Sequence, residues 1–146
     1  MIISVEIPVM ELFNQVLDQT LYDYRRSAQT GKATANEAAM SKNEYDIFFI
    51  NLKTLLDNVY GGSLGTIRAY ELGYDLIRAD MVSQAYISPD VIGSRLKDIL
   101  KFGMLRWWNS TRDLGLFEKY TLDYENTLSK LKQQLTGVIT RPYSYF

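Results

Sequence analysis

Apolar residues recur every three or four positions along most of the chain, which is the spacing of amphipathic helices. From about Pro8 to Ser27 this spacing predicts a first helix with one buried face. Its apolar stripe consists of Met10, Phe13, Leu17, Leu21 and Tyr24, widened by Leu12 and Val16. Ahead of this helix, Ile3, Val5 and Ile7 alternate with polar residues, so we expect a short strand-like or extended lead-in.

A second helix is expected after a polar loop over residues 29–36. Ser41 and Glu44 have the spacing of a capping box, in which two side chains bind backbone N–H groups at a helix start. An earlier start at Thr34–Glu37 has the same pattern. A wide apolar face then continues as far as Gly61 and predicts a central helix of about five turns. Its members are Tyr45, Phe48, Phe49, Leu52, Leu55, Leu56 and Val59.

The remaining periodic segments predict three more helices. A third is expected from near Thr66 until before Pro89, with apolar positions at Ile67, Tyr70, Tyr74, Ile77 and Met81. Ser88 is a good N-cap, and Pro89 suits a first helical turn, so a fourth helix should run to about Trp108. A fifth begins at Ser110–Asp113 and has a narrow stripe of Leu114, Phe117, Thr121, Tyr124, Leu128, Leu131 and Leu135. We expect that stripe to pack antiparallel on the first or second helix, with a helix of another copy as the alternative.

The segment after Gly137 favours an extended arm. Pro142 lacks a backbone N–H and biases the residue before it toward extended dihedrals, so the helix cannot continue through it. The aromatic side chains nearby offer large apolar surfaces with few rotatable bonds, which suits an interface. We predict a docking tail over residues 138–146, with folding back onto its own bundle as the alternative. The candidate partner-binding residues are Val138, Ile139, Arg141, Pro142, Tyr143, Tyr145 and Phe146.

Together these elements predict a single-domain, all-α bundle of about five helices over residues 1–137, with a short extended N-terminal lead-in and an extended C-terminal tail. The length of 146 residues, with 47% hydrophobic and 23% charged residues, is that of one ordinary globular domain.

Charge is unevenly distributed along the chain. Residues 1–90 hold 7 basic and 12 acidic residues, a balance of −5, and residues 91–146 hold 9 and 5, a balance of +4. Such polarity suits head-to-tail stacking of copies or contact with an acidic partner. Solvated charges scattered over the surface are the alternative interpretation.

Several chemistries are excluded or disfavoured by composition. The chain has no cysteine, which excludes disulfides and thiolate nucleophiles, and no histidine, the commonest general base and transition-metal ligand. No motif organises a base beside a serine, so we expect no enzyme, no catalytic residues, no cofactor and no metal. No leader and no apolar run near 18 residues is present, so we expect no membrane association and assembly in a cytoplasm.

The fourth helix offers a candidate contact surface. Projection at 100° per residue places Lys97, Lys101 and Trp108 on one flank, whereas Trp107 falls within the buried arc. We therefore predict that Trp107 is core and that Trp108 and the two lysines contact a partner. The functional alternative is a helical nucleic-acid-associated regulator that uses this basic face, although a sequence pI near 5.5 argues against nucleic acid as the main ligand.

The order of elements resembles that of the head-to-tail adaptor or connector proteins of tailed bacteriophages. The resemblance lies in a leading segment over Val5–Leu17, a polar loop, a long helix that ends at Leu52–Tyr60, further helices and an extended tail. It covers most of the chain as a layout and assigns no individual binding residue. It implies a virion protein that forms a ring-shaped homo-oligomer beneath the portal. Its arms would dock on neighbours, the portal or other tail proteins, and DNA would pass through the channel as cargo.

Overall fold

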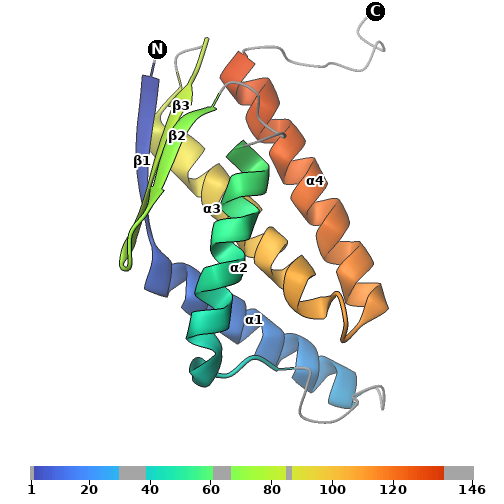
Figure 1. Ribbon diagram of the computed structural model, residues 1–146. Helices are drawn as coiled ribbons and strands as arrows, with labels where there is room; N and C mark the ends of the chain where they lie inside the picture. Colours follow the sequence, from blue (N-terminus) through green and yellow to red (C-terminus); the bar gives the residue numbers. More distant parts are fainter. Residues whose placement is uncertain (1, 30–38, 61–66, 85–86, 137–146) are drawn as a thin grey trace, which may run out of the picture.

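The computed structural model describes residues 2–29, 39–60, 67–84 and 87–136. Within these ranges the chain forms a three-stranded antiparallel sheet and four α-helices (Figure 1). In chain order the elements are β1 (Ile2–Pro8), α1 (Val9–Gln29), a 3₁₀ turn η1 (Lys42–Glu44), α2 (Tyr45–Asn58), β2 (Ile67–Leu72), β3 (Leu76–Val82), α3 (Pro89–Asn109) and α4 (Leu114–Thr136). The fold is mainly helical, but the prediction of an all-α bundle of about five helices is wrong.

The sheet has the order β1-β3-β2, so the first strand of the chain pairs with one from its middle. The register of β1 on β3 runs from Ile2 opposite Val82 to Pro8 opposite Leu76. Ile3, Val5 and Ile7 are buried and alternate with exposed residues, as the lead-in pattern predicted. The lead-in is therefore a seven-residue strand.

The segment expected as the third helix is instead the β2–β3 hairpin. Its apolar residues fit both a helical spacing and a strand spacing, because Ile77, Ala79 and Met81 occupy alternate positions and are all buried. The N–H of Gly73 donates to the carbonyl of Leu76 at 2.9 Å and closes the turn. Pairing of β2 with β3, and of β3 with β1, supplies the backbone hydrogen bonds that a helix would otherwise have provided locally.

Helix α1 begins directly after Pro8, close to its expected bounds, but its buried face is rotated from the predicted stripe. Leu12, Phe13 and Val16 are buried, and the face continues through two polar residues, Thr20 and Asp23. Met10 and Leu21, which were expected in the stripe, are 52% and 39% exposed. The rotation follows from a buried polar contact with α4, described below.

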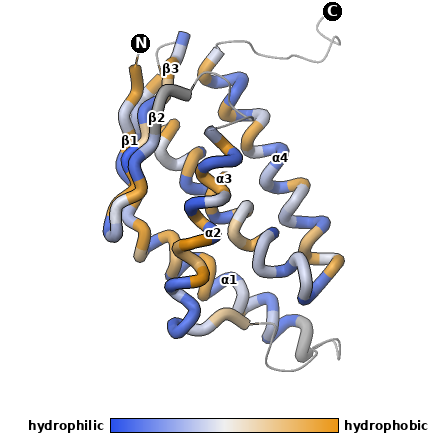
Figure 2. Tube along the Cα trace, in the orientation of Figure 1, coloured by the Kyte–Doolittle hydropathy of each residue, from blue (hydrophilic) through white to orange (hydrophobic). Residues whose placement is uncertain are grey.

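Helix α2 begins and packs as its sequence predicted. The N–H of Ser41 donates to Oε1 of Glu44 at 3.2 Å, and η1 leads directly into the helix. Phe48, Leu52 and Leu56 are fully buried. Figure 2 shows stretches of apolar residues along α2.

Helices α3 and α4 form an antiparallel pair joined by a short turn (Figure 1). Oγ of Ser88 accepts from the N–H of Asp90 at 3.3 Å, which confirms the predicted start of α3. Helix α4 begins after Asp113, whose Oδ1 accepts from the N–H of Leu116 at 3.0 Å, whereas Ser110, the expected first cap residue, is the C-cap of α3. The apolar stripe of α4 packs mainly on α3, not on the first or second helix as expected. Leu114, the first residue of that stripe, is 70% exposed.

One hydrophobic core joins the sheet to the helices. The inner sheet residues lie in a single cluster with the buried face of α3, which includes Ile92, Leu96, Ile99 and Leu100. Val5 of β1 lies directly over Gly93, where an added Cβ would meet Val5 Cγ1 at 3.6 Å. This packing places the edge of β1 beside the first turns of α3.

Candidate interaction surfaces

The predicted docking tail, residues 138–146, lies outside the described residues. The proposed roles of Val138, Ile139, Arg141, Pro142, Tyr143, Tyr145 and Phe146 therefore stay predictions. Helix α4 ends at Thr136, beside the sheet, where the carbonyl of Leu135 accepts from the N–H of Gln84 at 2.7 Å. This hydrogen bond ties the last turn of α4 to the residues that follow β3.

The burial of the two adjacent tryptophans differs from the prediction. Trp108 is 2% exposed and belongs to the core, whereas Trp107 is half-buried. The guanidinium of Arg112 lies 3.5 Å from the centroid of the Trp108 ring, and its Nη1 donates to the Trp108 carbonyl at 2.8 Å. The prediction failed because a single-helix projection does not include the neighbouring segments: Arg112, in the turn after α3, lies over the Trp108 ring, and Glu11 of α1 contacts Lys97 on the same flank. Trp107 thus replaces Trp108 as the candidate contact residue.

The basic flank predicted for α3 does not form a continuous exposed surface. Nζ of Lys97 forms an ion pair with Oε1 of Glu11 on α1, and the Lys97 side chain is 23% exposed. Lys101, one turn further, is half-buried. With Trp108 buried as well, the three residues do not form the continuous basic and aromatic surface that the sequence predicted.

An open cleft of about 510 Å³ lies between β1 and the first turns of α3. We call it the β1–α3 cleft. Among the described residues, β1 is an edge strand: β3 pairs with one side, and no backbone hydrogen bond joins its other side to another segment. The residues that line the cleft are Ser4, Val5, Glu6, Ile7, Pro8, Glu11, Pro89, Asp90, Gly93, Ser94 and Lys97.

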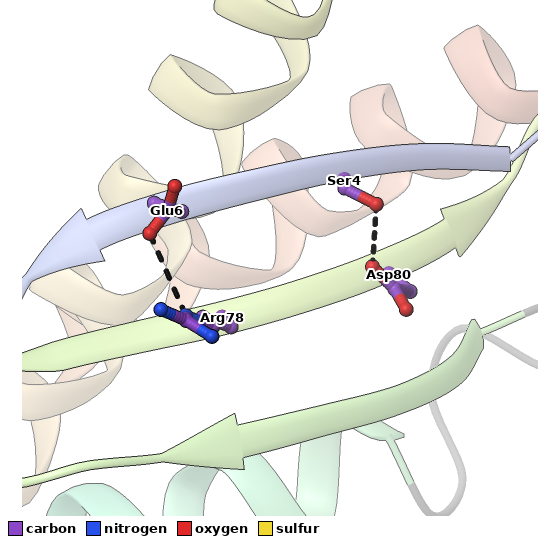
Figure 3. A network of polar contacts seen from close by, with 4 residues as sticks. All are labelled: Ser4, Glu6, Arg78 and Asp80. Atoms are coloured by element: carbon purple, nitrogen blue, oxygen red, sulfur yellow. Dashed lines mark hydrogen bonds and ion pairs between the residues drawn. The ribbon is translucent and has the colours of Figure 1, made fainter.

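The charges around this cleft are mostly acidic. Lys97 pairs with Glu11, which leaves Glu6 and Asp90 as the other charged residues of the lining. Glu6 lies 3.6 Å from Nε of Arg78, measured from its Oε2, but both side chains are more than 60% exposed, at 61% and 66%. Figure 3 shows this pair and the Ser4–Asp80 hydrogen bond of 2.6 Å on the polar side of the sheet. Such an exposed pair contributes little stability and leaves Glu6 open to another cation.

A second hollow of about 260 Å³ lies between α2, α3 and the start of α4, and we call it the α2–α3 groove. Leu55, Met104, Trp107 and Phe117 supply its apolar side chains. Its polar members include Asn51, Thr54 and Asn58, and the guanidinium of Arg106 lies 5.4 Å from the Phe117 ring centroid. An apolar floor with amide groups around it is suited to peptide contact.

The outer face of α2 is unusually apolar. Ile47 and Ile50 are 53% and 64% exposed, and Tyr74 at the tip of the β2–β3 hairpin is 72% exposed. The Tyr74 ring lies 5.9 Å from that of Phe49 and 6.1 Å from that of Tyr45, centroid to centroid. These aromatic contacts tie the hairpin to α2.

A buried polar cluster joins α1 to α4. The hydroxyl of Tyr120 donates to Oδ2 of Asp23 at 2.5 Å, and Nε2 of Gln19 donates to Oδ1 of the same carboxylate at 3.1 Å. Asp23 is 8% exposed and Tyr120 2% exposed. Burial raises the pKa of the Tyr120 hydroxyl, and the hydrogen bond to Asp23 raises it further. The cluster explains why the buried face of α1 includes Asp23, and it holds the two helices together.

Sequence reasoning missed the β1 edge and the α2–α3 groove. The alternation of Ile3, Val5 and Ile7 was the available signal for the first, because an isolated strand must lie in a sheet and a terminal strand often forms its edge. The groove gave no comparable signal, because its residues come from three helices whose mutual positions no local pattern specifies.

Within the described ranges, no group of three or more acidic side chains is placed to hold a metal ion. No helix of the described part of the chain is sufficiently long and apolar to cross a membrane.

Comparison with known proteins gave no relative. No family model matches the chain, and neither a curated protein nor a solved structure matches it.

Proposed function

We propose that the protein is a structural adaptor that self-associates through its C-terminal arm, residues 138–146, and joins two larger assemblies. The form we propose is that of a virion head-to-tail connector, a ring of copies that docks on a portal or a neighbouring tail component. DNA passes the ring as cargo and is not its specific ligand.

The observation that carries the proposal is the open outer edge of β1 beside the β1–α3 cleft. An edge strand presents unpaired N–H and C=O groups that accept another extended segment. The same molecule exposes apolar side chains on the outer face of α2, such as Ile47 and Ile50. Two unlike surfaces of this kind support a heterologous contact, in which one patch meets a different patch on the next copy and a closing rotation gives a ring.

Composition supports the same proposal. The opposite charge balances of residues 1–90 and 91–146 favour contact between unlike ends of neighbouring copies. Eleven tyrosines suit a protein with extensive interface, because a tyrosine side chain is apolar along its ring and polar at its hydroxyl. A net charge of −1 is compatible with a channel wall that DNA passes without strong phosphate contacts.

Removal of residues 138–146 tests the proposal. Native mass spectrometry and light scattering should show that the full chain forms oligomers and that the shortened chain has the mass of one copy. The far-ultraviolet circular dichroism of the described helices should be unchanged. Ser144→Ala within the arm is the matched control and should assemble like the unchanged chain. An oligomer that persists at equal concentration without the arm would refute the proposed role of the arm.

The alternative of a nucleic-acid regulator has less support from the described residues. Its basic face would need Lys97 and Trp108, but Lys97 is paired with Glu11 and Trp108 is buried beneath Arg112.

A further inference from the structure

We propose that the β1–α3 cleft of one copy receives residues 138–141 of a second copy, which pair as a fourth strand with the outer edge of β1. This inference rests on the proposed function, because it identifies the surface on which the arm docks.

The outer edge of β1 has backbone groups available for pairing. In an antiparallel pair, every second residue of an edge strand directs its N–H and C=O away from its partner. Among the described residues, these groups of β1 meet no backbone partner. An added strand would satisfy them, and its side chains would alternate between the cleft and solvent.

The cleft is large enough for a short extended segment. The cleft borders five residues of β1, from Ser4 to Pro8, and its volume is about 510 Å³. A segment of four residues spans roughly 13 Å when extended, which is shorter than the bordered stretch. Gly93 of α3 lines the cleft without a side chain that would narrow it.

The sequence of residues 138–142 favours a short added strand. Val138, Ile139 and Thr140 are β-branched and favour extended pairing. Pro142 has no N–H to donate, so continuous pairing ends after Arg141. The strand that residues 138–141 would form is therefore about as long as the stretch of β1 that lines the cleft.

The charge of the arm is opposite to that of the cleft. Arg141 is the only charged side chain in residues 137–146. The cleft offers the carboxylates of Glu6 and Asp90, and within the described chain the Asp90 side chain forms no ion pair. Asp90 lies in the first turn of α3, at the rim of the cleft, where a guanidinium can reach it from solvent. A second copy thus brings one cation to a site with unpaired negative charge.

A charge exchange in the full chain tests this assignment. Asp90→Arg and Arg141→Asp, made separately, should each raise the apparent dissociation constant of the oligomer about tenfold, because each places like charges together. The double variant restores opposite charges and should return the constant to within about threefold of the unchanged chain. Asp98→Arg is the matched control, since it makes the same charge change on α3 at an exposed residue outside the cleft.

Hydrogen exchange separates strand pairing from a purely electrostatic contact. The backbone N–H groups of residues 3–7 should be protected in the oligomer and should lose that protection in Arg141→Asp. If Asp90→Arg impairs folding, Ser94→Arg adds a cation to the same cleft at an exposed site and should weaken assembly similarly.

Three other results would overturn either the cleft assignment or the proposed function. If removing the arm abolishes assembly but Asp90→Arg and Ser94→Arg behave like Asp98→Arg, the arm docks elsewhere, the α2–α3 groove being the next candidate. The cleft assignment then fails while the adaptor proposal stands. If β1 is protected in a chain that stays monomeric, the arm docks on its own subunit and the assignment to a second copy is overturned. If assembly survives removal of the arm, the proposed function itself fails.

Discussion

Gly103 is the residue at which α2 and α3 approach most tightly among the glycines described. A Cβ added there would lie 2.6 Å from Cδ2, 2.8 Å from Cδ1 and 3.2 Å from Cγ of Leu55. Contacts below 3.0 Å require a shift, and because both branches of Leu55 are involved, rotation of one methyl group cannot relieve them. The glycine therefore leaves room for the Leu55 side chain between these two helices.

Gly103→Ala should lower the free energy of unfolding by about 1–2 kcal/mol, because the clash outweighs the gain in helix propensity of about 1 kcal/mol. The same change made in a Leu55→Ala background should raise it, since only the propensity gain remains. Urea unfolding of the four proteins measures both effects. A stabilising Gly103→Ala in the unchanged background would show that α2 shifts freely against α3.

Tyr120 is the second residue with a large structural consequence. Tyr120→Phe removes a hydrogen bond to the buried carboxylate of Asp23 and should cost about 1–3 kcal/mol of stability at neutral pH. Thr121→Val on the same helix loses only a bond from the Thr121 hydroxyl to the Phe117 carbonyl and serves as a milder control.

The raised pKa of Tyr120 also predicts alkaline sensitivity. Its hydroxyl keeps its proton in the folded protein at pH values where the unfolded chain, with a pKa near 10, has lost it. Its contribution to stability is thus complete below about pH 10 and declines as pH rises toward the folded pKa, by up to about 1.4 kcal/mol per pH unit. Burial and a hydrogen bond to Asp57 also raise the pKa of Tyr70, to about 12, so part of the decline should persist in Tyr120→Phe. The difference in unfolding free energy between the unchanged protein and Tyr120→Phe should therefore shrink from pH 9 to pH 11. A constant difference over that range would contradict the shift.

At the scale of elements, the helices begin near the residues that their local sequences predict, and the strands depend on distant partners. Helix α4 begins where Asp113 accepts the N–H of Leu116, three residues from its own position. The β2–β3 hairpin, by contrast, completes its sheet with β1, and their registered residues Ile3 and Met81 are far apart in the chain. Helix starts can therefore be changed locally, but changes in a strand affect the whole sheet.

Asp113→Ala should destabilise the protein by about 0.5–2 kcal/mol through loss of the helix cap, and Asp113→Asn should retain most of the stability, because an asparagine oxygen also accepts from the N–H of Leu116. Thermal unfolding followed by circular dichroism compares the three proteins. Equal losses in both variants would assign the effect to the charge of Asp113 near the helix start and not to capping.

At the scale of the whole molecule, a small sheet covers one end of the helices, and α2 lies on the front of the α1 and α3 layer (Figure 1). The β1–α3 cleft and the exposed face of α2 are built from different elements, so contact between unlike surfaces needs no symmetry within the chain. The proposed arm docks on the first of these surfaces, the β1–α3 cleft, and its removal, described above, is the test that belongs to this scale.

The sequence by itself determined the elements whose signals are local. Capping residues, proline positions and apolar spacing predicted the starts of α2, α3 and α4 and the strand-like lead-in, because these depend on side chains within a few residues of one another. Only the tertiary structure decided that β2 and β3 form a hairpin whose second strand pairs with β1, that Trp108 is buried while Trp107 is half-exposed, and that Lys97 meets Glu11. In each case the deciding partner lies on another element, and a period in the sequence specifies which face is apolar but not what covers it.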